Sequence, residues 1–156
     1  MDFTKIPLVV TRVESMMTIN NVSSSDATQI TAVLNDVLAS NQLYTDITPD
    51  IVAITKNGLF NAGDIPHLMT IILQSSIFSA IILASIKNNN IKNIPKNTFT
   101  EYSVYGVLYL LFLTNNVPDP DLTVFDLLFP GLWKLSALTF TAIESGSKVI
   151  ASGCCA

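Results

Sequence analysis

The chain has 156 residues, which is the usual size of one domain and enough to bury a core without metal ions or disulfide bonds. Only 13% of its residues are charged, against a usual value of about 25%, while 49% are hydrophobic, so an intrinsically disordered chain is excluded. The net charge of −4 and the scattered Lys and Arg residues argue against a nucleic-acid-binding protein, which needs a basic face.

Residues 6–19 are the first candidate helix. Pro7 suits the first turn of a helix, and apolar side chains recur at helical spacing behind it. They are Val9, Val10, Val13, Met16 and Met17. The β-branched residues also permit a strand, but we favour a helix. Residues 1–20 are then either the first helix of the domain or an extending arm.

Residues 26–40 show the clearest pattern in the chain, that of an amphipathic helix. Asp26 and Gln29 resemble a capping box, in which two side chains satisfy the free backbone amides at a helix start. The predicted buried stripe consists of Ile30, Val33, Leu34, Val37 and Leu38. Because only one side is apolar, this helix needs an apolar partner within a folded domain.

The third predicted helix is short and begins at Thr48. Pro49 and Asp50 suit its first turn, and Asn57-Gly58 suits its end. Residues 61–64 are expected to form the loop that leads to the next helix.

Residues 65–87 have about the length of a membrane span and, before Lys87, no ionisable side chain other than one histidine. Polar groups near the middle of a span would need partners in lipid, and this stretch has three of them in succession. These are Gln74, Ser75 and Ser76. We therefore predict that residues 65–87 form the central apolar helix of a single all-α domain of five to six helices.

A second apolar helix follows, with a capping box at Thr98–Glu101 and its body at residues 102–117. The alternative interpretation is a membrane hairpin over residues 65–117, with the cytoplasmic loop marked by its lysines. These are Lys87, Lys92 and Lys96. Small residues that recur every fourth position, Ser76, Ala80 and Ala84, allow close helix packing in lipid and in soluble proteins alike.

The C-terminal third is expected to hold two more helices. Asp119 and Pro120 suit the start of a short helix that ends at Pro130-Gly131, and a last helix covers residues 131–145. We expect one helical domain over residues 1–146 and a flexible tail over 147–156. The adjacent Cys154 and Cys155 cannot staple the fold, and we expect reduced cytoplasmic thiols.

Aromatic residues form two candidate binding surfaces. Four of them follow one face of the helix at 102–117, and three surround Pro130-Gly131. Core packing is the default interpretation, and the alternative is a docking surface, because aromatic rings anchor protein interfaces. The candidate interface residues are Tyr102, Tyr105, Tyr109, Phe112, Phe125, Phe129 and Trp133.

Recognisable catalytic and ligand-binding motifs are missing from the sequence. One histidine rules out a multi-histidine metal site, and His67 suits a capping or solvent-exposed role. Phosphate-binding loops and nucleophile motifs are absent, and the acids at Asp119 and Asp121 suit a helix start. We therefore expect no catalytic residue, no cofactor and no metal ion, and we do not expect an enzyme.

In overall composition the chain resembles the small helical minor capsid, or cement, proteins of large icosahedral DNA viruses. The stretches that carry this resemblance are KNNNIKNIPKN at 87–97 and VPDPDLTVF at 117–125. The resemblance implies a subunit that bridges major capsid units and contacts an inner membrane, in the virion or the host cytoplasm. We expect a structural protein that binds other subunits or its own copies through apolar helix faces, with no nucleic-acid partner. The alternatives are a small integral membrane protein with the hairpin at 65–117 and a soluble helical protein-binding modulator.

Overall fold

The computed structural model describes residues 2–56, 62–85, 94–114, 126–127, 129–131 and 133–134. The chain forms two compact units, Met1–Leu122 and Thr123–Ala156, and each is considered by itself. Every element within the described residues is helical, so the predicted all-α fold is confirmed. The domain bounds of 1–146 stay a prediction, and the expected tail at 147–156 lies outside the described residues.

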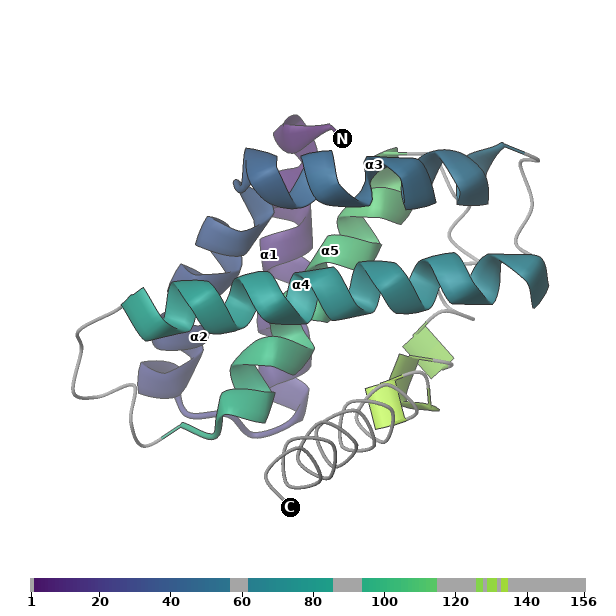
Figure 1. Cartoon of the computed structure of the whole chain (residues 1–156). Helices are drawn as coiled ribbons and strands as arrows, with labels where there is room; N and C mark the ends of the chain where they lie inside the picture. Colours follow the sequence, from purple (N-terminus) through teal and green to yellow (C-terminus); the bar gives the residue numbers. More distant parts are fainter. Residues whose placement is uncertain are drawn as a thin grey trace, which may run out of the picture. The chain divides into compact units, whose positions relative to one another are not determined.

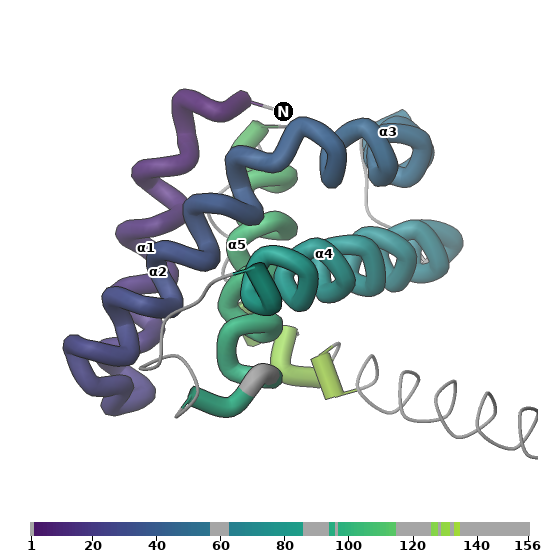
Figure 2. Tube along the Cα trace, turned by 60° about the vertical axis from the view of Figure 1, so that its left-hand side comes forward, coloured from purple at the N-terminus to yellow at the C-terminus, as the bar shows by residue number. Residues whose placement is uncertain are grey.

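The first unit contains five α-helices among its described residues, in two directions (Figures 1 and 2). The upright helices are α1 (Ile6–Ile19), α2 (Ser24–Leu38) and α5 (Lys96–Thr114). Helices α3 (Asn41–Thr55) and α4 (Ile65–Ser85) lie side by side across them. Two short 3-10 helices, η1 (Phe3–Lys5) and η2 (Ala62–Asp64), precede α1 and α4.

Helix α4 contacts α2, α3 and α5, which confirms the central apolar helix expected at 65–87. Helix α5 is nonetheless the more deeply enclosed of the two apolar helices. It contacts α1, α2 and α4, and every residue from Tyr102 to Leu108 is buried. On α4 only one side is buried, through Leu68, Ile71, Ile72, Ser75 and Ser79.

The predicted helix at 6–19 is confirmed as α1. Its inward side chains, Val9, Val13 and Met17, are buried, and the helix packs against α2 and α5. Just before α1, residues at η1 are hydrogen-bonded to the C-terminal end of α5. The backbone amide of Asp2 donates to the Thr114 hydroxyl at 3.0 Å, and the Lys5 ammonium donates to the Leu113 carbonyl at 2.7 Å. These bonds satisfy groups at a helix C-terminus, where carbonyls lack partners within the helix.

Helix α2 begins earlier than the capping-box pattern predicts. Ser23 is its N-cap, and its hydroxyl accepts a hydrogen bond from the amide of Asp26 at 3.2 Å. Asp26 lies in the first turn, where a carboxylate interacts favourably with the helix dipole. The predicted buried stripe of this helix is confirmed in full.

The prediction that the third helix begins at Thr48 is wrong. Helix α3 begins after Ser40, whose hydroxyl accepts from the amide of Leu43 at 3.3 Å, and Pro49 lies inside the helix. Four buried side chains on α3 span both sides of the proline, namely Leu43, Tyr44, Ile47 and Ile54. Their packing outweighs the one backbone hydrogen bond that a proline removes, because tertiary contacts supply most helix stability in proteins.

The capping box expected at Thr98–Glu101 is also wrong, because these residues lie inside α5. The helix begins at Lys96, directly after Pro95, and the Thr98 amide donates to the Pro95 carbonyl at 3.0 Å. The first turn is therefore formed before the predicted cap is reached.

In the second unit, residues 126–127, 129–131 and 133–134 are all helical. The prediction that a helix ends at Pro130-Gly131 is wrong, because both residues are helical. The remainder of the helix expected at 131–145 lies outside the described residues.

Tyr44 on α3 is expected to destabilise the fold through its hydroxyl. Its ring packs edge-on against Phe3 at a centroid distance of 5.3 Å, and the buried oxygen has no hydrogen-bond partner among the described residues. Because a buried unpaired hydroxyl costs about 1–3 kcal/mol, Tyr44→Phe should raise the free energy of unfolding by about 1 kcal/mol. Urea denaturation followed by circular dichroism measures this change. A loss of stability in Tyr44→Phe would show that the hydroxyl has a partner.

The same residue is expected to make the protein sensitive to alkali. Burial raises the pKa of the Tyr44 phenol above its ordinary value of about 10. The unfolded chain then releases this proton at a lower pH than the folded chain, so stability is lost as the pH rises above about 10. Tyr44→Phe should flatten the decline in unfolding free energy between pH 9 and pH 11. If the decline in unfolding free energy with pH were the same in Tyr44→Phe as in the wild type, the raised pKa of Tyr44 would not be its cause.

Candidate functional site

The aromatic residues of α5 lie largely inside the first unit. Tyr102, Tyr105 and Phe112 are buried, and Tyr109 is half-buried. The structure therefore favours the core interpretation for three of the four rings. Their use as a docking surface stays a prediction.

The hydroxyls of two of these rings bond to side chains of α1 and its C-terminal cap. The Asn20 amide donates to the Tyr102 hydroxyl at 3.0 Å, and Arg12 donates to the Tyr105 hydroxyl at 3.4 Å. Tyr105 stacks on Tyr109 at 5.8 Å between centroids, with the Arg12 guanidinium 6.0 Å from the Tyr109 ring. Burial raises the pKa of the Tyr105 phenol above its ordinary value. These contacts hold α5 against α1.

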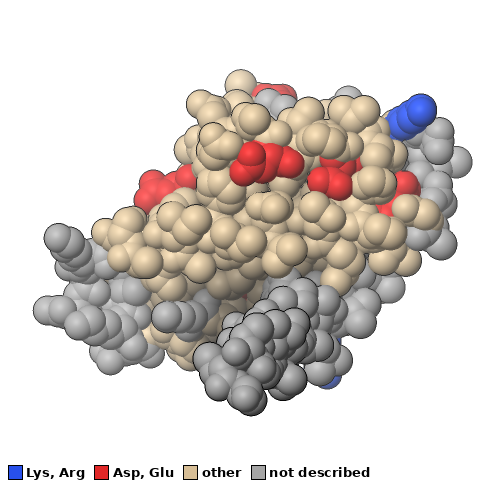
Figure 3. Space-filling model, in the orientation of Figure 1, with Lys and Arg blue, Asp and Glu red and all other residues tan. Residues whose placement is uncertain are grey.

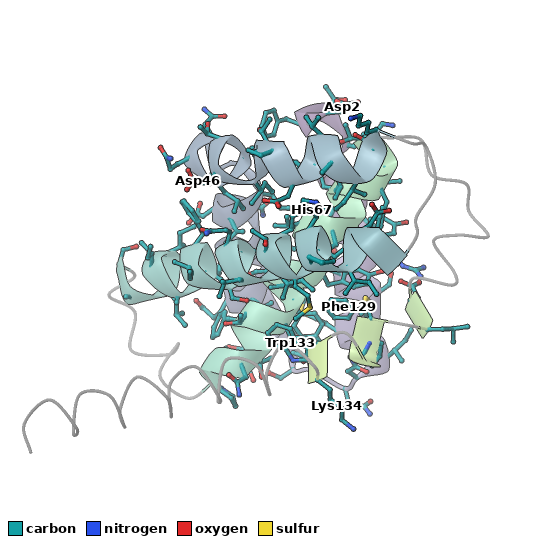
Figure 4. The ribbon with its side chains drawn as sticks, turned by 45° about the vertical axis from the view of Figure 1, so that its right-hand side comes forward. Asp2, Asp46, His67, Phe129, Trp133 and Lys134 are labelled. Atoms are coloured by element: carbon teal, nitrogen blue, oxygen red, sulfur yellow. The ribbon has the colours of Figure 1, made fainter. Side chains whose placement is uncertain are left out.

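The second aromatic cluster is described only in part. Phe129 and Trp133 stack with their centroids 6.5 Å apart (Figure 4), and Phe125 lies outside the described residues. The role of this second aromatic cluster in binding stays a prediction.

His67 has a partner that the sequence pattern did not reveal. Its Nδ1 lies 2.9 Å from Oδ1 of Asp50, so the pair joins the start of α4 to α3, and the ring is 41% exposed (Figure 4). Within the described part of the chain, no cluster of three or more His, Cys, Asp or Glu side chains could hold a metal ion. We therefore interpret the pair as a link between two helices.

The outward side of α4 is apolar as well, and it forms a row of exposed apolar side chains on the described surface. Ile77 is 43% exposed and Ile81 is 58% exposed, while Ala80 and Ala84 beside them are exposed too. Leu73, partly exposed, extends the row by one turn. We call these five residues the outer stripe, because the positions i, i+4, i+7, i+8 and i+11 share one helix face.

An outer stripe of this kind differs from the isolated apolar residues of a normal surface. Leu8 on α1 is exposed too, but the residues one turn further along its helix are Thr11 and Arg12. Scattered residues of this type need no explanation, whereas a contiguous apolar row marks a binding surface. Of the helices the structure describes, α4 is also the one long and apolar enough to cross a membrane, with 33% of its most apolar window buried.

Carboxylates border the outer stripe on the side of α3. The surface over α4 shows no charged side chain in this view, while acidic side chains lie above it, on the side of α3 (Figure 3). Asp46 and Asp50 belong to α3, where they lie one helical turn apart. Asp46 accepts a hydrogen bond from Gln42 at 2.9 Å and is exposed. The face is thus apolar along α4 and negative along one border.

The sequence predicted that α4 is apolar and carries small residues, but it did not predict which side of the helix would be exposed. The repeat of Ser76, Ala80 and Ala84 indicates close helix packing, and the structure leaves the last two exposed. An excess of apolar residues all round α4 was the available signal.

Comparison of the chain with protein-family models, with curated proteins and with solved structures finds no match. The functional interpretation therefore rests on the chain's own geometry.

Proposed function

We propose that the protein is a non-catalytic assembly protein that binds another protein subunit through the outer stripe of α4. The observation that carries this proposal is that α4 is apolar on both sides while only its inner side packs within the unit. A minor capsid subunit of a large DNA virus is the setting that the sequence resemblance favours. A soluble binding modulator would use the same face with a smaller partner.

The energetics support a protein partner. Fully burying one isoleucine side chain contributes about 1.5–3 kcal/mol, and the exposed parts of Ile77 and Ile81 together amount to about one such side chain, so enclosing them would stabilise a complex by about 1.5–3 kcal/mol. Large apolar side chains at the centre of an interface commonly contribute most of the binding energy. The unusually low charge of the chain reduces the desolvation cost around them.

The membrane hairpin at 65–117 is the competing proposal. The length and apolar character of α4 favour it, whereas the enclosure of α5 by α1, α2 and α4 favours a protein that packs its own apolar helices. Carbonate extraction of membranes from the native source distinguishes the two. Release into the soluble fraction supports assembly, and retention in the pellet supports the span.

Site-specific photo-crosslinking tests the proposal directly. A benzoylphenylalanine in place of Ile81 is expected to form covalent adducts with one or a few protein species in the native source. The same probe in place of Leu8, which is exposed on α1 with Thr11 and Arg12 one turn further along, is the matched control and should give none. Adducts with lipid alone, or equal protein adducts at both positions, would overturn the proposal.

A further inference from the structure

We infer that the outer stripe accepts an amphipathic helix of a partner protein whose apolar row is bordered by Lys or Arg side chains. This inference rests on the proposed function and adds the chemistry of the partner. It combines two observations, the shape and spacing of the stripe and the charge beside it.

The shape of the stripe suits a helix. Its five residues span twelve positions, which is about 18 Å along α4 and about three turns of a partner helix. Ala80 and Ala84 are small, so a partner can approach closely over them, while Ile77 and Ile81 provide ridges. Apolar side chains at i, i+4 and i+7 of the partner would fill the spaces between these ridges.

Among the described residues of α2, α3 and α4, the side-chain charge is negative. Residues 24–85, which cover α2, α3 and α4, contain five Asp residues and one Lys, so they carry the chain's net charge of −4 by themselves. Their one cation, Lys56, follows the end of α3, and α4 has no Lys or Arg. Asp46 is exposed on α3 and therefore presents negative charge beside this face, whereas the Asp50 carboxylate is bonded to His67 (Figure 4). A basic border on the partner complements this field, and an acidic border is repelled.

The same charge disfavours the other occupants. A second copy would bring another uncharged α4 with its own acidic border, and no cation on that helix could pair with Asp46. An anionic membrane surface attracts helices with Lys and Arg on the polar face, and α4 has neither. A basic amphipathic helix satisfies both the apolar row and the negative border.

Binding of designed peptides to the full chain tests this inference. The probes are two fluorescein-labelled helical peptides of 18 residues with the same Leu and Ala row, one bordered by Lys and the other by Glu. Fluorescence anisotropy should show at least tenfold tighter binding of the Lys peptide at low salt. This advantage should shrink in 0.5 M NaCl, because salt screens exposed charges.

Matched variants locate the binding site. Ile81→Ser should weaken binding of the Lys peptide about tenfold, and Leu8→Ser should not change it. Asp46→Asn should weaken the Lys peptide about threefold and leave the Glu peptide unweakened, while Glu14→Gln on α1, with the same change in charge, should have no effect.

Equal binding of the two peptides, or Lys-peptide binding that ignores both Ile81→Ser and Asp46→Asn, would overturn the inference. Two further results would do so by naming another occupant. One is a dimer of the chain alone in sedimentation equilibrium that Ile81→Ser dissolves, and the other is flotation with phosphatidylserine vesicles that Ile81→Ser abolishes. The photo-crosslinking result distinguishes failure of this inference from failure of the proposed function. If protein adducts form at position 81 but the Lys peptide is not preferred, the inference fails and the proposed function stands.

Discussion

Gly106→Leu is expected to lower the free energy of unfolding by about 3 kcal/mol, because α5 crosses α2 at this residue with no room for a side chain. A Cβ atom at Gly106 would lie 2.5 Å from Cδ1 of Leu34, 3.5 Å from Cγ1 of Val9 and 3.7 Å from Cδ2 of Leu38. All three of these side chains are fully buried, so Leu34 cannot turn away into solvent. The helices must separate, and each loses contacts along its length.

Smaller changes at the same crossing measure the cause. Gly106→Ala should cost less, because alanine favours a helix over glycine by about 1 kcal/mol and offsets part of the clash. Shortening the neighbour in the double variant Gly106→Ala/Leu34→Val should recover about 1 kcal/mol relative to the sum of the single changes. Urea denaturation monitored by circular dichroism gives the four free energies of unfolding that are needed, those of the wild type, Gly106→Ala, Leu34→Val and the double variant.

The control for added volume is Ala32→Leu, at an exposed position of α2, which should change stability by less than about 0.5 kcal/mol. If Gly106→Leu proved as harmless as Ala32→Leu, the close crossing of α2 and α5 would be wrong.

Leu108→Ala is expected to cost about 2–5 kcal/mol, whereas Ile81→Ala on α4 should change stability by no more than about 0.5 kcal/mol. Leu108 is fully buried on α5, so its truncation leaves a cavity that the surrounding helices cannot fill. Ile81 is 58% exposed, and its truncation removes side-chain atoms that largely face water. The pair compares equivalent truncations on the two apolar helices.

Thermal and urea unfolding of the purified full-length variants measure this contrast. Ile81→Ala should keep the wild-type unfolding midpoint while weakening any partner bound at the outer stripe. Similar large losses for both variants would mean that α4 is enclosed on both sides, and the outer stripe would then not be a binding surface.

Several elements could be predicted from local sequence patterns alone. The stripe of α2 from Ile30 to Leu38 was confirmed residue by residue, because a 3.6-residue apolar period places its members on one helix face. The same reasoning located α1, whereas α4 was located by its long apolar run without Asp, Glu, Lys or Arg. Helix starts were less predictable: Ser23 and Ser40 cap α2 and α3, whereas the stronger-looking signals at Asp26 and Thr48 fall inside helices. Packing on both sides of Pro49 decided the second case, and packing is invisible to a local pattern.

The candidate site could be predicted only in kind. The sequence indicates binding through apolar helix faces, and it names the tyrosines of α5, most of which the fold places inside. A helix that is apolar all round has no periodic signal to say which side will be covered, and both α4 and α5 are of this type.

The amino-acid sequence by itself determined that this protein is all-α, low in charge and built on two apolar helices, because these properties follow from composition and from spacing along one element. Only the tertiary structure decided that α5 is enclosed while α4 keeps an apolar outer stripe. That choice depends on which helices α1, α2 and α3 can cover at once, and Gly106 lets α2 approach α5 closely enough to enclose it.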